Sequence, residues 1–260
     1  MKSISELKEN ILVEEKKELK YLRFSPLEKF GFVKHGFILG SKDGAKIDSS
    51  EIPELVSKAS GIPVEKIKIV IPRQVHQAQV LSFRETLEDK VIRNEGDGLL
   101  TDQENLFLVI QVADCLPVFL VDPEKELVGL AHIGWRGALS GMAGRIVQSS
   151  KTVFKSKPAN LHLVLGPSIG KCCYKISDDL AVLFDEKYLD KRGRENYLDL
   201  GYFVKDKFLK SGVKEENILL SGECTFCGDK SYQSYRREKE KAGRMIAFIG
   251  KVTGRLDLNH

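Results

Sequence analysis

The sequence predicts an α+β fold with layered helices and mixed β-sheets, formed by a single domain over residues 1–260. Short apolar runs typical of strands and stretches with helical spacing both occur, without strict strand–helix alternation. No internal repeat, low-complexity tract or Pro/Ser-rich linker divides the chain. The length of 260 residues allows one or two domains, and the absence of a linker favours one.

Helical spacing predicts four helices, and the first overlaps residues 1–25, which are expected to form an N-terminal extension. In the second helix, Leu139, Met142 and Ile146 recur at helical intervals. The predicted helices cover residues 5–20, 138–154, 177–187 and 200–210.

Apolar runs predict the strands. Residues 64–71 alternate, and residues 106–122 hold two β-rich runs that meet at Ala113-Asp114-Cys115. The other predicted strands are residues 127–131, 161–165 and 245–250.

Composition excludes several classes of protein. Lys plus Arg number 41 and Asp plus Glu 37, giving a net charge of +4, which is too balanced for a nucleic-acid or membrane-surface protein. The first twenty residues lack the apolar segment of a secretory signal. No run reaches the ~18 apolar residues of a membrane span, so a cytoplasmic location is expected. An odd count of five Cys favours reduced thiols.

Three residues form a candidate metal site. His76, Cys115 and His132 each stand where an apolar run stops, and two imidazoles with one thiolate suit a catalytic Zn²⁺ with one open position. Asp114 is a candidate acceptor for a histidine N–H. The spacings match no zinc-finger rule, so the alternative is a buried small Cys115 beside two histidines with structural partners.

Two segments are candidate anion sites. Between His132 and Gly137 a strand ends, two Gly flank Trp135-Arg136 and a helix begins, which favours phosphate binding by Arg136 and the helix N-terminus. Near the C-terminus, Tyr235-Arg236-Arg237 and Arg244 form the second candidate. The alternatives are a Gly-rich turn with a structural salt bridge, and a solvated basic edge.

The remaining motifs are weaker. Cys224-x-x-Cys227 is a single CxxC motif without a second one in the sequence. The adjacent residues Cys172-Cys173 are too close in sequence to complete a four-cysteine metal site with it, so structural thiols are expected. Ser168 stands in a turn that is expected to line a cleft, and the carboxylate of Asp97 is expected to face the site.

Taken in order, these blocks resemble the YfiH-like family, which carries the labels multicopper polyphenol oxidase (laccase), purine nucleoside phosphorylase and peptidoglycan editing factor. The resemblance runs from about residue 35 to 250. It is carried by Gln74-Val75-His76, Asp97–Thr101, Ala113–Val118, Ala131–Gly137, Gly166–Gly170 with Cys173-Tyr174, Cys224-Thr225, and Ser234–Arg237 with Gly243-Arg244.

The resemblance implies a fold distantly similar to bacterial toxin cysteine hydrolases and one zinc ion bound by His76, Cys115 and His132. It also implies phosphorolysis of purine nucleosides, with adenosine deamination and methylthioadenosine cleavage as related activities. Catalytic roles are expected for Cys115, Asp114, Arg136 and Asp97. Substrate contacts are expected from Arg73, Gln74, Trp135, Arg136, Ser168, Tyr235, Arg236 and Arg237.

Three positions depart from the family pattern. Gly40 stands where an Arg is usual, Gln77 replaces a Gly after the first zinc histidine, and Lys175 replaces a Glu. The first removes a candidate phosphate ligand, and the third removes a carboxylate.

Other functions remain open at this point. Five His fall short of the roughly ten that a four-copper laccase centre needs, so copper is the weaker expectation. A hydrolase with Cys115 as nucleophile and His132 as base, editing a peptidoglycan precursor, is a second enzymatic interpretation. A metal- or nucleoside-binding module without turnover is a third. The oligomeric state, monomer or homodimer, stays open.

Overall fold

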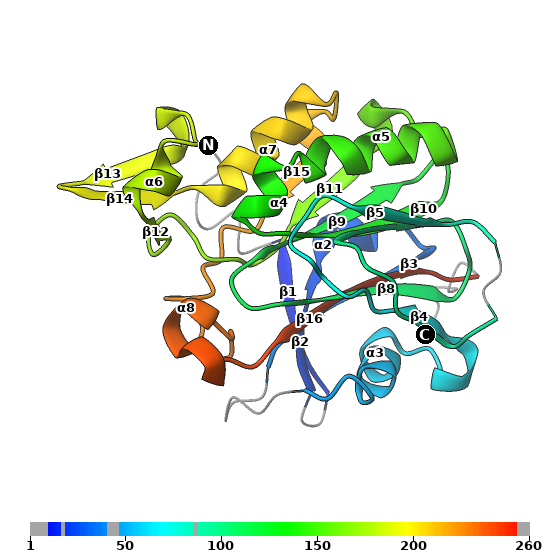
Figure 1. The fold of residues 1–260 in the computed structure, drawn as a ribbon. Coiled ribbons are helices and arrows are strands. Elements are labelled where there is room, and N and C mark those ends of the chain that lie inside the picture. The colour runs from blue at the N-terminus through cyan, green and yellow to red at the C-terminus, as the bar shows by residue number, and fades with distance from the viewer. Residues whose placement is uncertain (1–9, 17–18, 41–46, 86–87, 254–260) are drawn as a thin grey trace.

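The computed structural model describes residues 10–16, 19–40, 47–85 and 88–253, and it has the predicted α+β class (Figure 1). Two large mixed sheets are present, with strand orders β1-β2-β3-β16-β8-β4-β6 and β15-β11-β9-β10-β7-β5, and a small antiparallel sheet has the order β12-β14-β13. The strands are β1 (Ile11–Lys16), β2 (Leu19–Phe24), β3 (Val33–Ile38), β4 (Lys68–Val70), β5 (Val80–Phe83), β6 (Val91–Ile92), β7 (Gly98–Thr101), β8 (Leu106–Val112), β9 (Leu116–Asp122), β10 (Leu127–Ile133), β11 (His162–Leu165), β12 (Lys175–Ile176), β13 (Leu189–Arg192), β14 (Glu195–Leu198), β15 (Ile218–Leu220) and β16 (Met245–Lys251).

The helices cover the outer faces of the two large sheets. α5 and α7 lie over the six-stranded sheet, and α3 lies on the far side of the seven-stranded sheet (Figure 1). None of the helices among the described residues is both long and apolar enough to cross a membrane. The helices are α2 (Ser25–Glu28), α3 (Ile52–Ser60), α4 (Trp135–Leu139), α5 (Met142–Phe154), α6 (Asp178–Ala181), α7 (Leu200–Lys210) and α8 (Tyr235–Glu238).

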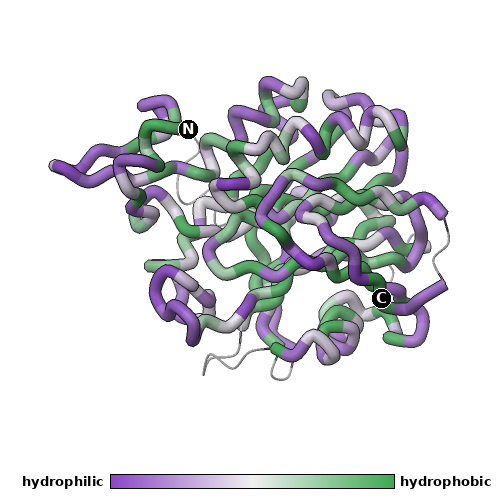
Figure 2. The backbone as a smooth tube through the Cα atoms, in the orientation of Figure 1, coloured by the Kyte–Doolittle hydropathy of each residue, from purple (hydrophilic) through white to green (hydrophobic). Residues whose placement is uncertain are grey.

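Strand alternation produces the layers. On β9, Phe119 and Val121 point into the core between the two sheets, whereas Val118 and Leu120 face α5 and α7. On β8, Leu108 points into the same inter-sheet core. The apolar strands therefore run through the middle of the molecule, with hydrophilic residues toward the outside (Figure 2).

Three predicted helices and one predicted strand differ from the structure. The predicted helix over residues 5–20 is wrong where the structure describes it, because Ile11–Lys16 and Leu19–Phe24 form an antiparallel hairpin. Tyr21 and Leu22 are buried on opposite faces of that hairpin, which is a strand period rather than a helix period. Residues 1–9 and 17–18 lie outside the described residues, so the described part of the predicted N-terminal extension belongs to the sheet.

The other differences concern boundaries. Residues 64–66 of the predicted strand form a 3₁₀ turn, and only Lys68–Val70 pairs. The helix predicted over 177–187 ends at Ala181, because Phe184 and Tyr188 both pack against Phe203 of α7 and turn the chain. The helix predicted over 138–154 is divided by Gly141, which has a left-handed φ of 84°. The helix over 200–210 is confirmed.

His35 on β3 makes the free energy of unfolding depend on pH. Its ring is buried, and its Nε2 accepts a hydrogen bond of 2.8 Å from the Phe24 backbone N–H. Burial, with smaller contributions from the charges of Arg23 and Lys34, lowers the pKa of His35 to about 3. The neutral imidazole is therefore part of the folded state, whereas the unfolded chain protonates it at an ordinary pKa near 6.5.

We expect the free energy of unfolding to fall as the pH drops below about 6.5, by about 1.4 kcal/mol per pH unit until the pH approaches 3. The unfolded state binds one more proton in this window, so acid favours it. Urea unfolding of the wild type and of His35→Gln between pH 7 and 5 measures the contribution. The variant should be less stable at pH 7 and should show the shallower slope; equal slopes would contradict this account.

Candidate metal centre

Strand pairing brings the three predicted metal ligands together at one end of the six-stranded sheet. β9 and β10 are antiparallel neighbours, with Ile133 opposite Leu116, so Cys115 and His132 lie at the same end. β10 continues to Ile133, and His132 therefore lies within the strand rather than just after it. His76 comes from the loop that follows β4. The three ligand atoms lie within 4.8 Å of one another, and the predicted grouping is confirmed as geometry.

One buried carboxylate orients both histidines. Asp97 is fully buried, and its Oδ1 lies 2.8 Å from Nδ1 of His132. The same carboxylate accepts hydrogen bonds from the backbone N–H groups of Val75, His76 and Gln77, at 3.2, 3.0 and 2.9 Å. These bonds hold the loop in which His76 has a left-handed φ of 57°. With Nδ1–H of His132 donated to Asp97, its Nε2 is free to bind a metal.

Electrostatics favour an ionised Cys115. Burial raises the pKa of Cys115, but hydrogen bonds from His132 and His76 outweigh burial and lower this pKa to about 6. Burial lowers the pKa of His132, but its bonds to Asp97 and Cys115 raise this pKa to about 9. Burial raises the pKa of Asp97, and the bonds from His132 and the Gln77 backbone reverse that effect. A Cys115 thiolate thus lies beside a protonated His132, and binding of a metal ion would release the proton from Nε2 of His132.

The residues present fit a metal ion. Two imidazoles and a thiolate are the preferred donors of zinc, and a Zn²⁺ at bond lengths of about 2.0–2.3 Å requires donor atoms about 3.3–3.8 Å apart. The backbone leaves room beside the donors, because a Cβ on Gly134 would lie 3.1 Å from Sγ of Cys115 and 3.6 Å from the His76 ring. His132 is buried while His76 is exposed, so the site opens on one side only.

That open side faces a cavity of about 590 Å³. Three guanidinium side chains line it, from Arg136, Arg236 and Arg244, and Arg136 stacks on the ring of Trp135 with 4.5 Å from Cζ to the centroid. The cavity is therefore cationic beside the metal ligands and has aromatic and aliphatic walls. Its remaining lining residues are Pro72, Gln74, His76, Gln111, Ala113, Asp114, Cys115, His132, Gly134, Ile169, Tyr174, Leu200 and Tyr235.

Asp114 has a different contact from the one predicted. It does not accept a bond from either metal-site histidine; that contact is made by Asp97. Asp114 has a φ of 85°, and its carboxylate accepts bonds from Thr225 Oγ1 at 2.7 Å, Ser234 Oγ at 3.1 Å and the Arg236 N–H at 2.6 Å. It thus ties the turn before Cys115 to the segment that carries Arg236.

Several predicted substrate contacts lie elsewhere. Arg73 is exposed, pairs with Glu95 and does not line the cavity. Ser168 is buried and forms an isolated β-bridge with Cys224, outside the strands. Arg237 donates to the carbonyl oxygens of Thr225, Phe226 and Tyr232, a structural arrangement.

Other residues predicted to contact the substrate do line the cavity, but their hydrogen bonds or helix geometry differ from the prediction. Gln74 lines the cavity, but its amide exchanges two hydrogen bonds of 2.8 Å with the backbone of Gln111. The helix that begins at Trp135 has only five residues, too short to form an anion site through its N-terminus. The side chain of Arg136 is then the remaining candidate anion-binding group of this motif.

The departures from the family pattern lie outside the cavity lining. A Cβ on Gly40 would meet the side chain of Gln233 at 2.4 Å, so the glycine leaves room for that residue. Lys175 pairs with Glu195, while its backbone oxygen accepts a 2.6 Å bond from Arg236. The sequence did not identify Leu200 or Gln111 as lining residues, since neither carries a chemical signal.

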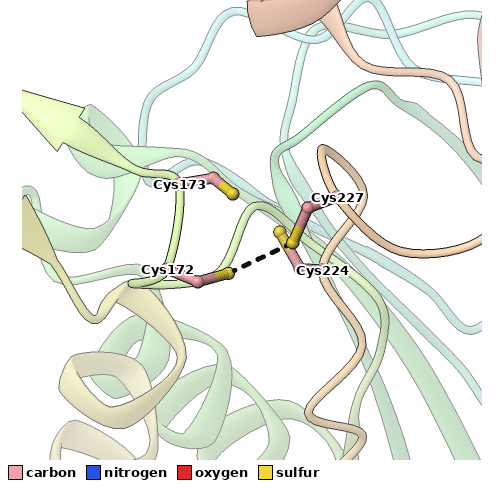
Figure 3. Close-up of side chains that lie close together, drawn as sticks. All are labelled: Cys172, Cys173, Cys224 and Cys227. Carbon is pink, nitrogen blue, oxygen red and sulfur yellow. Dashed lines mark hydrogen bonds between the residues drawn. The ribbon is translucent and has the colours of Figure 1, made fainter.

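The four cysteines expected to be structural thiols lie together, so the adjacent pair Cys172-Cys173 is not too close in sequence to complete the group. Cys172, Cys173, Cys224 and Cys227 place their sulfur atoms within 4.8 Å of one another (Figure 3). A tight turn, closed by a 2.9 Å bond from the Cys173 N–H to the Gly170 oxygen, lets adjacent cysteines face the same partner loop. Of the other described histidines, His35 is a buried acceptor and His162 packs against Phe30.

Comparisons with known proteins identify the family of the chain. The model of a family described as multi-copper polyphenol oxidoreductase laccase matches residues 47–251. The purine nucleoside phosphorylase YlmD of Geobacillus stearothermophilus is 37% identical over 60% of this chain and 60% of its own length. A purine nucleoside phosphorylase of Staphylococcus saprophyticus is 30% identical over 80% of this chain and 82% of its own length.

A solved structure shows the same fold. Crystalline YlmD from Geobacillus stearothermophilus superposes with a TM-score of 0.80 at 26% identity, covering 94% of this chain and all of that one. The sequence matches span 60% and 58% of the Geobacillus and Bacillus subtilis relatives, less than two thirds of either. Because the family model matches well over half of the residues, the chain belongs to the YfiH-like family, whose model is described as multi-copper polyphenol oxidoreductase laccase.

Proposed function

We propose that the protein is a zinc-dependent purine nucleoside phosphorylase, acting on inosine, guanosine or adenosine. The observation that carries the proposal is the juxtaposition of three guanidinium groups, aromatic walls and a three-ligand metal site in one cavity. A nucleoside offers a flat apolar base, and phosphate offers the anion that arginine binds through two N–H groups. The relatives named as purine nucleoside phosphorylases support the same substrates.

Phosphorolysis joins a phosphate oxygen to the anomeric carbon of ribose. The bond from that carbon to the purine nitrogen breaks, and its electron pair leaves with the purine. Arg136, Arg236 and Arg244 would bind the phosphate, and Arg136 is already oriented by its stacking on Trp135. Tyr174 and Leu200 would contact the nucleoside in the same cavity. His76, Cys115 and His132 would hold the metal ion, which as a Lewis acid withdraws charge from the group that it contacts.

Zinc is the proposed ion rather than copper. The donor set forms one three-ligand centre, and neither His35 nor His162 lines the cavity. The described histidines therefore do not supply the ligands that a laccase-type set of coppers needs. Metal analysis of protein purified without added metal tests this directly. Several copper atoms per chain would contradict the proposal.

The arginines should control the use of phosphate. We expect Arg136→Met and Arg244→Met each to raise the KM for phosphate about 10- to 100-fold, since a charge-assisted bond contributes about 1.5–3 kcal/mol. Arg145→Met is the matched control, because Arg145 is exposed on α5 and does not line this cavity. Inosine cleavage with and without phosphate, with ribose 1-phosphate as the measured product, is the assay. Cleavage that yields free ribose at the same rate without phosphate would contradict phosphorolysis.

A second candidate has its own observation. Asp97, His132 and Cys115 form a continuous series of contacts, which is the arrangement of a cysteine nucleophile with a histidine base and an orienting carboxylate. A hydrolase acting on an amide or ester would use it. Trapping of Cys115 by a thiol-directed electrophile in metal-free protein, together with amide or ester hydrolysis by that protein, would favour this candidate. Protection of Cys115 until chelation favours the metal enzyme.

A further inference from the structure

Four of the five cysteines form a cluster separate from the candidate metal centre. Cys172 and Cys173 come from the turn between β11 and β12, and Cys224 and Cys227 come from the loop between β15 and α8 (Figure 3). Their sulfur atoms all lie within 4.8 Å of one another, and Sγ of Cys172 is 3.5 Å from Sγ of Cys227. None of these cysteines lines the cavity that contains Cys115.

Hydrophobic packing does not explain this cluster. Cys172 and Cys227 are exposed, and Cys173 is half-buried; only Cys224 is buried. Exposed thiols gain little by packing, so their convergence from two loops calls for a common partner. The sulfur separations fit tetrahedral zinc, since Zn–S bonds of about 2.3 Å place sulfurs about 3.8 Å apart.

The backbone around the sulfurs has the form of a metal-binding loop. The Gly170 N–H donates a 3.3 Å bond to Sγ of Cys224. A Cβ on Gly170 would lie 3.3 Å from Sγ of Cys172, and a Cβ on Gly228 would lie 2.4 Å from the Cys224 carbonyl oxygen. Two glycines thus permit the close approach of the loops.

Two guanidinium groups bond to the backbone of the cysteine turns. Arg192 donates to the Cys172 and Lys171 carbonyl oxygens at 3.0 and 3.2 Å, and Arg237 donates to the carbonyl oxygen of Phe226, inside the Cys224–Cys227 turn, at 2.8 Å. Each guanidinium group also pairs with an acidic side chain, Asp190 or Glu238, so its contribution is to hold the backbone of its turn in place.

We propose that Cys172, Cys173, Cys224 and Cys227 bind one zinc ion in a structural tetrathiolate site. The site joins two segments that also form the cavity: Ile169 and Tyr174 flank one cysteine pair, and Tyr235 and Arg236 follow the other. All four positions around this zinc are taken by protein, so it has no open position for substrate. Its role is to hold the two cavity walls together.

Metal counting on reduced, full-length protein tests the proposal. The wild type should hold one more zinc per chain than the Cys172→Ser/Cys227→Ser variant, whereas Cys115→Ser should lose only the zinc of the other centre. In wild type loaded with Co²⁺, the visible spectrum should contain the intense bands of a tetrathiolate, and the double variant should lose them. Equal zinc content in the wild type and the double variant would overturn the proposal, as would iron in place of zinc.

A second measurement uses only the wild-type protein, so it tests the proposal even if the double variant does not fold. In wild-type protein, alkylation followed by mass spectrometry should find these four cysteines protected until a strong chelator is added. Rapid alkylation of all four without chelator would overturn the proposal. A mass decrease from disulfide formation in the freshly isolated protein, without zinc, would overturn it as well.

Discussion

Replacing Cys115 by alanine should lower the rate of phosphate-dependent inosine cleavage at least about 1,000-fold, equivalent to about 4 kcal/mol of transition-state stabilisation. Cys115 supplies the only sulfur and the only anionic donor of the candidate metal centre. Without it, only two imidazole donors remain, and zinc affinity falls sharply. Zinc content and ribose 1-phosphate formation should therefore decline together.

The matched control is Arg145→Met. Arg145 is exposed on α5, outside this cavity and both groups of candidate metal ligands, so zinc content and activity should remain. Urea unfolding of both variants shows whether either loses its fold. A Cys115→Ala protein that is folded, free of metal at this centre and fully active would refute the assignment of the site.

Asp97→Asn is expected to have the second largest effect. The carboxylate of Asp97 accepts bonds from the His132 ring and from three backbone N–H groups of the loop that carries His76. In Asp97→Asn, an NH₂ group replaces one carboxylate oxygen and can no longer accept the hydrogen bonds that this oxygen accepts in the wild type. We expect a loss of about 3 kcal/mol in unfolding free energy and a 10- to 100-fold loss of zinc affinity.

Asp122→Asn separates the two effects. Asp122 is equally buried, at the far end of β9, and accepts bonds from the Glu124 and Lys125 N–H groups. Its amide variant should lose stability but keep zinc affinity, measured by competition with a chromogenic chelator. Wild-type zinc affinity in Asp97→Asn would mean that this carboxylate does not position the ligands.

The sequence grouped the three residues of the candidate metal centre because their chemistry is local. His76, Cys115 and His132 each carry a rare donor beside an apolar run, and paired strand ends bring such residues together. Asp97 was predicted to face the site, but its role was assigned to Asp114. Both are acidic residues beside strand ends, and only the β7–β10 pairing decides which one reaches His132.

The parts that were missed depend on contacts distant in sequence. The cysteine cluster joins turns from two separate loops, so no spacing rule could detect it. Leu200 lines the cavity only because α7 begins there. The N-terminal segment was predicted as a helix because its pattern of charges also suits a helix. It forms a hairpin instead, because its pairing with β3 outweighs that local pattern.

The most direct test of the account is activity during metal removal and return. Inosine and phosphate are incubated with native, chelator-stripped and zinc-reloaded protein, and ribose 1-phosphate is measured in each case beside the zinc content of the chain. The account predicts that phosphorolysis disappears on stripping and returns as zinc refills the centre formed by His76, Cys115 and His132. Full phosphorolysis by the folded, stripped protein would contradict it.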